Sequence, residues 1–388
     1  MSVKSQQAVC LRISGGREFG KLIEHVSASS RTIVGADRVT FWMLGKDQRT
    51  LASLPSSEGG RVFRLAFGRG LVGACAQKQQ IIVTADAYRD PLFDQRDDKR
   101  RSYRTVSELC LPILHDDELI GVVQASNRLR SDGVSVRIPL RKGVIVIGEF
   151  AEDDVVRLRE VANLACAAFE NARHLQAHRL LIDELSFTLA DAISVRDTTT
   201  GKHIKLVTVI AVEVAREMGL SEDAVQEIKI AAALHDIGKI GVRDHILLKP
   251  VKFTQKDYRA MKTHAHKGRR ILRKIDWPKG LEAVPYLVGS HHELCDGSGY
   301  PAGLMKDEIS LSAHIITVSD IFAAVAQKRP YKEAHGPHYA LKLCRDEARS
   351  GKLDPKVVRA LARVIEHHGF EALERRSSKS RAGSFLSS

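Results

Sequence analysis

The sequence lacks the marks of a membrane protein and of a disulfide-stapled secreted protein. No apolar run in its 388 residues approaches the roughly 18 residues that a membrane-spanning helix needs, and the first residues lead into no hydrophobic core of a signal peptide. The six cysteines are scattered and contain no Cys-x-x-Cys pair, which excludes that thiolate zinc motif and argues against a disulfide framework. We therefore expect a cytoplasmic protein with reduced thiols and no membrane partner.

The composition is typical of a globular protein with a local excess of positive charge. At 44% hydrophobic and 28% charged residues, disordered and collagen-like classes are excluded, and the length allows two or three domains of about 150 residues. The formal net charge is +13, and residues 239–274 contain twelve Lys or Arg against two Asp. Such a cluster is typical of proteins that bind nucleic acid, an anionic membrane or a phosphorylated small molecule; a solvated helix face is the alternative.

The N-terminal part predicts an α+β domain over residues 17–154. Residues 19–33 have the periodicity of an amphipathic helix, and a short helix is expected over 70–76. Strand-like segments alternate with turns between and after these helices. They lie at 38–44, 80–83, 109–114 and 119–124, and residues 133–147 suggest an added hairpin. We expect an antiparallel sheet with flanking helices.

Residues 152–195 contain neither Gly nor Pro, and their apolar residues recur at steps of three and four, which predicts one long helix. A second copy is the natural way to bury its stripe, so we expect a homodimer through 155–195, with packing inside its own chain as the alternative. Residues 196–368 predict an all-helical domain. The basic, Ser-rich residues 369–388 predict a disordered tail.

Histidines and aspartates recur through the helical half at intervals close to 30 residues. In a helical bundle this spacing places ligands on successive helices, where they can converge on a metal site. Imidazole and carboxylate without thiolate suit iron, manganese, zinc or nickel, and this set is too large for one ion. We therefore expect two divalent ions, iron in the first place and manganese next. Their expected ligands are His203, His235, Asp236, His264, His291, His292 and Asp320.

Asp236 is the candidate bridge between the two ions, because a shared carboxylate is the usual way to hold two cations close together. Such a pair makes a nucleophile of bound water, which indicates phosphoric-ester hydrolysis. Lys239 follows a glycine break in this motif, where it could meet a phosphate oxygen or protonate a leaving alkoxide. Asp236 and Lys239 are therefore the expected catalytic residues.

The ordered motifs resemble the HD-GYP domain, a branch of the HD phosphohydrolase superfamily whose members hydrolyse cyclic di-GMP. The motifs are Thr200 to His203, His235 to Lys239, Met261 to His264, the loop from His291 to Pro301, and Asp320 with Arg329 to Lys332. The resemblance implies that the seven donors are metal ligands. It further implies that Lys239, Arg329 and Lys332 contact the phosphates, and that Gly299, Tyr300 and Pro301 lie beside the substrate or a signalling-protein partner.

Three departures from the family pattern bear on activity. Ser194 stands where members often carry a Glu that is associated with a third metal, so we expect two metals and linear pGpG as the product, with onward hydrolysis to GMP left open. Ala323 and Ala326 replace polar residues near the ligands, and such losses typically weaken metal affinity or rate about 10–100-fold. Leu294, Cys295 and Val251 also depart, near the expected substrate contacts.

The N-terminal half resembles a GAF domain, a sensor module that holds a small ligand or dimerises. The resemblance rests on Gly70 to Gly73, Ala85 to Phe93, Leu111 to Ile113, Ile120 to Val122, and Asn127-Arg128. Asn127, Arg128, Phe150 and Asp154 approximate a signature of cyclic-nucleotide-binding relatives, although Val155 replaces its last Glu. The GAF ligand is unknown, with cyclic nucleotide binding left open. Haem held by His115 and reactivity at Cys75 or Cys110 are not expected.

We expect, from these patterns together, a GAF sensor, a long connecting helix and an HD-GYP helical bundle that hydrolyses cyclic di-GMP. One alternative is a cyclic di-GMP receptor or interaction platform with feeble turnover, and another is hydrolysis of a different cyclic dinucleotide, such as cyclic GMP-AMP. A nucleic-acid-binding regulator resting on residues 239–274 would bind with a steep salt dependence. We do not expect nucleic acid, because the basic residues interleave with the ligands.

Overall fold

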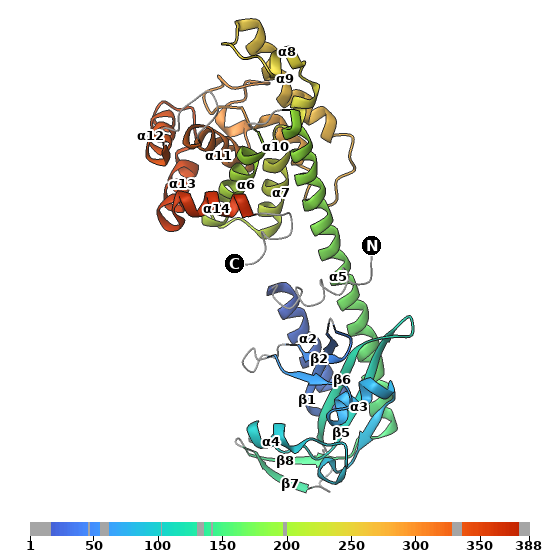
Figure 1. Cartoon of the computed structure of the whole chain (residues 1–388). Coiled ribbons are helices and arrows are strands. Elements are labelled where there is room, and N and C mark those ends of the chain that lie inside the picture. Colours follow the sequence, from blue (N-terminus) through green and yellow to red (C-terminus); the bar gives the residue numbers. More distant parts are fainter. Residues whose placement is uncertain are drawn as a thin grey trace. The chain divides into compact units, whose positions relative to one another are not determined.

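The structure is a computed structural model that describes residues 17–45, 47–54, 62–101, 103–129, 136–140, 143–196, 200–327 and 336–379. The chain divides into two compact units, Met1–His178 and Arg179–Ser388. Figure 1 labels most of their helices and strands. The division lies inside α5 (Glu152–Arg196), a helix of 45 residues that begins in the first unit and ends in the second. The predicted long helix is confirmed.

The first unit is built on an antiparallel sheet. The strand order is β3-β2-β1-β6-β5-β4, and β8 pairs with both β6 and β7. The strands are β1 (Ala36–Leu44), β2 (Thr50–Ser53), β3 (Arg64–Ala66), β4 (Ile82–Thr84), β5 (Glu108–His115), β6 (Glu118–Leu129), β7 (Val136–Leu140) and β8 (Gly143–Gly148). The helical elements are α2 (Arg17–Val34), α3 (Gly70–Lys78), η1 (Ala87–Arg89) and α4 (Gln95–Arg101). The predicted α+β class and the added hairpin β7–β8 are confirmed.

The sheet has an apolar core on each face, because successive side chains of a strand point to opposite sides. Phe41 of β1 packs in the core that includes Leu158 and Phe169 of α5. Its neighbour Trp42 packs in the other core, with Leu71 and Cys75 of α3. The two cores hold α5 and α3 against the sheet.

The residues that approximate the cyclic-nucleotide signature tie the end of β6 to the start of α5. Arg128 Nε donates to Asp154 Oδ2 at 2.9 Å, and the same oxygen accepts from the Ala151 N–H at 3.1 Å. Asn127 is buried at a positive φ of 58°, and its Oδ1 accepts from the Val106 N–H at 2.7 Å. These side chains therefore stabilise the local structure around the end of β6 and the start of α5.

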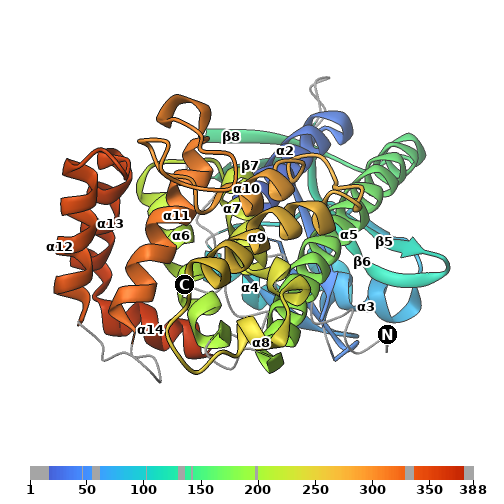
Figure 2. The same cartoon turned by 90° about the horizontal axis from the view of Figure 1, so that it is seen from above.

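The second unit is helical, as predicted. Its elements after α5 are α6 (Thr200–Glu217), α7 (Glu222–Leu234), η2 (Ile237–Gly241), α8 (Asp244–Leu247), α9 (Gln255–Leu272), α10 (Val284–Ser290), η3 (Lys306–Glu308), α11 (Leu311–Ala326), α12 (Gly336–Arg349), α13 (Pro355–His368) and α14 (Phe370–Lys379). Side-chain caps begin several of them: Ser221 accepts from Ala224 N–H before α7, and Ser310 from Ala313 N–H before α11. Most of α11 is buried, and it packs between α6 and α12 (Figure 2).

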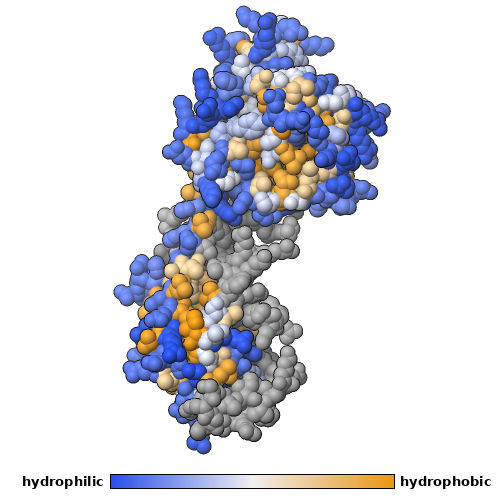
Figure 3. Space-filling view, turned by 180° about the vertical axis from the view of Figure 1, so that it is seen from behind, coloured by the Kyte–Doolittle hydropathy of each residue, from blue (hydrophilic) through white to orange (hydrophobic). Residues whose placement is uncertain are grey.

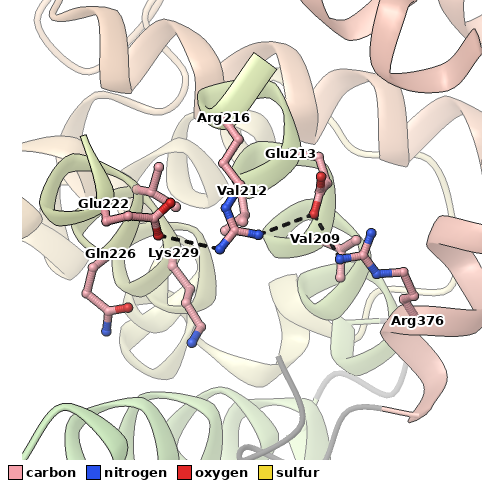
Figure 4. A pocket seen from close by; sticks show the side chains of 9 residues that line it. Val209, Val212, Glu213, Arg216, Glu222, Gln226, Lys229 and Arg376 are labelled. Atoms are coloured by element: carbon pink, nitrogen blue, oxygen red, sulfur yellow. Dashed lines mark hydrogen bonds and ion pairs between the residues drawn. The ribbon is translucent and has the colours of Figure 1, made fainter. Parts of the chain in front are cut away.

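The expected disordered tail is wrong for residues 370–379, which form α14. Leu373 is fully buried in the core of this unit, and Arg376 donates to Glu213 Oε1 of α6 at 2.9 Å. Glu213 lies near Arg216 as well, beside a pocket between α6, α7 and α14 (Figure 4). The Ser-rich composition suggested disorder, but tertiary contacts stabilise the helix.

The part of the chain that the structure describes contains no helix that is both long and apolar enough to cross a bilayer.

Candidate metal centre

The structure brings all seven predicted metal ligands together. His203 lies on α6, His235 and Asp236 directly follow α7, His264 lies on α9, His291 and His292 follow α10, and Asp320 lies on α11. Within three overlapping groups the ligand atoms all lie within 4.8 Å of one another. The groups are His264, His291, His292; His203, His235, Asp320; and His235, Asp236, His291. The near-30-residue spacing therefore reflects helices that meet at one place.

A glycine allows the close approach of the two segments that carry Asp236 and His264. A Cβ added to Gly238 in η2 would lie 1.9 Å from the carbonyl oxygen of His264 and 2.5 Å from the amide nitrogen of Gly268. Any larger side chain would therefore force η2 and α9 apart. The glycine break that the sequence shows after His235-Asp236 is a packing requirement.

Three imidazoles are oriented by the same local bond. Nδ1 of His235, His264 and His291 lies 2.7, 2.8 and 2.7 Å from the carbonyl oxygen three residues earlier, on Ala232, Met261 and Val288. Because a carbonyl only accepts, each Nδ1 carries a proton, and Nε2 is the atom that faces the cluster. A second bond supports one of these turns, since Thr317 Oγ1 donates to the His291 carbonyl oxygen at 2.9 Å.

Each carboxylate lies between imidazoles. Asp236 Oδ2 is 3.4 Å from His235 Nε2, and Asp236 Oδ1 is 3.6 Å from His264 Nε2. Asp320 Oδ1 is 2.8 Å from His203 Nε2, and Asp320 Oδ2 is 3.9 Å from His292 Nδ1. Each of the two aspartates thus directs its two oxygens toward two different imidazoles.

The buried charges of the site favour a cation. Burial raises the pKa of Asp236, but Lys239, with Nζ at 2.8 Å, and His235 outweigh burial and hold that pKa well below its usual value. Burial likewise raises the pKa of Asp320, and the His203 hydrogen bond holds it far below the usual range. Burial lowers the pKa of His235, yet the two aspartates raise it to about 9. Both carboxylates are therefore ionised at neutral pH.

Burial holds three further imidazoles neutral. Burial, with neighbouring imidazoles, depresses the pKa of His264 and His291, and burial lowers that of His292 to about 4. His264 Nε2 and His291 Nε2 face each other at 3.3 Å, although both rings carry their proton on Nδ1. Two facing lone pairs are unfavourable unless a cation lies near them. Nδ1 of His203 is also buried with no hydrogen-bond partner among the described residues. The donor set therefore fits divalent metal ions.

The predicted Gly-Tyr-Pro loop lies beside the centre. The Tyr300 ring centroid is 4.7 Å from that of His292, and Lys262 Nζ lies 4.8 Å from the Tyr300 ring. A Cβ at Gly299 would lie 2.3 Å from the Leu294 amide nitrogen, so this position requires glycine. Arg329 and Lys332, the other predicted phosphate contacts, lie outside the described residues.

Glu293 is the residue that the sequence interpretation missed. It is 1% exposed, and its two oxygens accept from the backbone N–H groups of Ala302 at 2.7 Å and Leu304 at 3.0 Å. This carboxylate holds the loop that carries Tyr300. The sequence shows Glu293 directly after His291-His292. Its bonds, however, go to backbone N–H groups nine and eleven residues later, and a side-chain motif gives no signal for such bonds.

The departures noted in the sequence have structural counterparts. Ser194 donates to the Ala190 carbonyl oxygen at 2.9 Å, within α5. Ala323 and Ala326 are buried in the apolar core, at 0% and 3% exposure. Apolar packing thus occupies the two positions of α11 where polar residues were expected.

Part of the basic cluster lies beside the centre, since Lys239 Nζ is 2.8 Å from Asp236 and Lys262 Nζ is 4.8 Å from the Tyr300 ring. His264 lies on α9, and Lys262 and Lys267 flank it on the same helix. Figure 3 shows hydrophilic residues gathered over the end of the unit formed by α8 and α9. Both acidic residues of this cluster are paired, Asp244 with Arg196 and Asp257 with Lys249. The surface therefore presents mainly cations to the solvent.

Comparison with known proteins gives two family matches. Residues 188–357 match the HD domain, and residues 19–169 match the GAF domain. A cyclic di-GMP phosphodiesterase of Thermotoga maritima is 43% identical over 170 residues, 44% of this chain and 45% of that protein. The cyclic di-GMP phosphodiesterase response regulator RpfG of Xanthomonas campestris pv. campestris is 41% identical over 176 residues, 45% of this chain and 46% of that protein.

A third relative carries a different substrate in its name. The 3'3'-cGAMP-specific phosphodiesterase 2 of Vibrio cholerae is 35% identical over 165 residues, 42% of this chain and 31% of that protein. The chain thus spans less than half the length of each of these three relatives.

Proposed function

Because the chain combines an HD domain over residues 188–357 with a GAF domain over residues 19–169, we propose that it is a metal-dependent phosphodiesterase that hydrolyses cyclic di-GMP to linear pGpG. One observation carries this proposal: five histidines and two aspartates from α6, α9, α11 and the segments after α7 and α10 converge in a buried cluster with Lys239 at its edge. The names of two relatives support the substrate.

The seven side chains would hold two divalent cations, which supply Lewis-acid polarisation of the phosphate and a nucleophile from water at neutral pH. His235, His264 and His291 present Nε2 because their Nδ1 protons are bound to backbone carbonyls. Asp236 would contribute one oxygen to each side of the centre. Iron and manganese are the proposed ions, since such mixed donor sets accept several divalent metals.

Lys239 is the proposed proton donor or phosphate contact. Its Nζ lies 2.8 Å from Oδ2 of the buried Asp236, which places its amino group at the edge of the centre. Lys262 and the Tyr300 ring would meet a phosphate and a base of the dinucleotide. The same loop is the proposed contact for a signalling-protein partner.

The test combines metal analysis with product analysis. Protein purified without oxygen should contain about two metals per chain, and incubation with cyclic di-GMP should yield pGpG on chromatography. Asp236→Asn should abolish the product, whereas Asp307→Asn, at an exposed aspartate in η3, should leave it unchanged. Protein that binds no metal under any loading condition would refute the site. Bound metal with the dinucleotide returned intact would instead favour the receptor function that Ala323 and Ala326 suggest.

A second candidate substrate is 3'3'-cGAMP, because one relative that matches the same helical unit is specific for it. The two substrates share both phosphodiester bonds and differ in one base. Equal amounts of cyclic di-GMP and 3'3'-cGAMP in one reaction would therefore report the ratio of kcat/KM directly. A ratio in favour of 3'3'-cGAMP would replace cyclic di-GMP in the proposal.

We also propose that the chain forms a homodimer through α5 and that the GAF domain regulates the phosphodiesterase through this helix. Leu164, Leu175, Leu185 and Leu189 are 74%, 57%, 54% and 46% exposed, and at 100° per residue they fall within about 80° of one another. Leu175→Glu with Leu185→Glu should produce a monomer in light scattering. Glu184→Lys, at an exposed position about 140° from the middle of this stripe by the same count, is the control, and an unchanged mass in the double variant would refute the dimer.

A further inference from the structure

The segment that follows Asp236 is held from two helices by cationic side chains. Arg196 Nη1 donates to the Ile240 carbonyl oxygen at 2.8 Å, and Arg196 Nη2 donates to that of Val242 at 3.3 Å. Between them, Lys267 Nζ of α9 donates to the Gly241 carbonyl oxygen at 2.7 Å. Three consecutive carbonyls at the end of η2, those of Ile240, Gly241 and Val242, therefore each accept a bond from a charged donor, the stronger kind of hydrogen bond.

Arg196 makes a further contact with this segment. Its guanidinium group pairs with Asp244, the first residue of α8. One side chain thus spans the stretch from Ile240 to Asp244. A planar guanidinium group with several fixed donors suits such a task better than an ammonium group.

The held segment includes the groups proposed for catalysis. The Lys239 N–H donates to the Asp236 carbonyl oxygen at 2.9 Å, and the Val242 N–H donates to that of Lys239 at 3.0 Å. These bonds join Asp236, Lys239 and Val242 into one short, tightly bonded stretch. A shift of the carbonyls at 240 and 242 would therefore move Lys239, whose Nζ contact with Asp236 is 2.8 Å.

Apolar burial supports this stretch at Val242, which is 3% exposed, but not at the two residues before it. Ile240 is 55% exposed, and Gly241 is exposed as well. On the side of α9, the close contact of Gly238 with the His264 backbone fixes the stretch. On the other side, Arg196 supplies the contacts to Ile240 and Val242, and it is the last residue of α5.

We propose that Arg196 is a positioning residue: it sets the place of Lys239 by holding the carbonyls of Ile240 and Val242, and so joins the end of α5 to the catalytic segment. This inference rests on the proposed phosphodiesterase function. Because Arg196 ends α5, any displacement of that helix end changes the position of Lys239. Among the described residues, Arg196 contacts Ile240, Val242 and Asp244 but none of the seven residues that would hold the ions, so we expect metal content to be retained.

The test compares Arg196→Gln, Arg196→Lys and a control, Asp244→Asn, in the full chain. Arg196→Gln should lower kcat by about 10–100-fold, as expected for a misplaced catalytic group, with KM and metal content unchanged. Arg196→Lys should recover part of this loss, because it keeps a cationic donor. Asp244→Asn should stay within about twofold, since both carbonyl bonds remain.

A double variant separates positioning from a general structural role. In a Lys239→Ala background, the group that Arg196 positions is already absent, so adding Arg196→Gln should lower kcat little further. A full additional loss in that background, a fall in metal content, or an unchanged kcat in the single variant would each overturn the proposal.

Hydrogen exchange distinguishes this inference from the proposed function. Peptides that cover residues 237–246 should exchange faster in Arg196→Gln than in the parent, with Asp244→Asn showing a smaller effect. If the parent chain hydrolyses no dinucleotide, the proposed function fails, and the exchange result alone decides whether Arg196 holds the segment. Unchanged exchange in Arg196→Gln would overturn the inference in that case as well.

Discussion

Replacing Gly238 with alanine tests how closely η2 must approach α9. The new Cβ would lie 1.9 Å from the His264 carbonyl oxygen, while ordinary contact begins at 3.4 Å, so the two segments would have to separate by about 1.5 Å. Both neighbours of this Cβ, at His264 and Gly268, are backbone atoms, so no side-chain rotation relieves the overlap. Metal–ligand distances tolerate only about 0.2 Å. Asp236 and His264 could not then serve one centre.

We expect Gly238→Ala to lose most bound metal and its hydrolytic activity, and to lower the free energy of unfolding by about 3 kcal/mol, the upper part of the range for overpacking. Metal analysis, product chromatography and urea unfolding measure the three effects. Gly241→Ala is the matched control for metal content, because the nearest neighbours of its Cβ are atoms of the flexible Lys267 side chain, the first at 3.0 Å. A Gly238→Ala protein with two metals and the parent rate would refute the reasoning.

Three further predictions follow from buried polar groups. Glu293→Ala removes the acceptor of two backbone N–H groups and should lower the free energy of unfolding in urea by about 3 kcal/mol. Glu293→Gln should lower it less. Equal urea midpoints for the parent and both variants would contradict this role. Lys229 Nζ lies 2.6 Å from Oδ2 of the buried Asp183. Lys229→Ala removes this partner and should lower the free energy of unfolding by about 3–5 kcal/mol. The control is Arg179→Ala, which breaks an exposed pair with Asp223 and should lower the free energy of unfolding by less than about 1 kcal/mol. If thermal unfolding showed similar losses for the Lys229 and Arg179 variants, burial would not be the cause. Metal-free protein should bind Mn²⁺ more tightly at pH 8.5 than at pH 6.5, because His235, with a pKa near 9, must release its proton; calorimetry that shows equal affinity would contradict this.

The sequence predicted the features that depend on spacing and on local composition. The uninterrupted stretch 152–195 became α5, and the ligands from His203 to Asp320 converged because each lies on, or next to, its own helix. The hairpin β7–β8 followed from two β-rich segments around a short turn. In each case, the pattern that determines the structure lies within a short stretch of chain.

Features that depend on distant contacts escaped prediction. Helix α14 is polar and Ser-rich, and its stability comes from the burial of Leu373 and the pair of Arg376 with Glu213. Glu293 and Arg196 act on backbone groups, which carry no side-chain signature. A sequence motif identifies a metal ligand by its chemistry. It does not identify the side chain that holds a neighbouring loop or segment of the site in place.

The protons on Nδ1 of His235, His264 and His291 also make these rings observable. Each proton is buried and bonded to a carbonyl oxygen, so its exchange with water is expected to be slow. Each ring should therefore give its own low-field resonance in a proton NMR spectrum. A paramagnetic ion such as Fe²⁺, coordinated through the opposite ring nitrogen, would displace these resonances strongly, and the three signals would report how many ions have bound before any substrate is added.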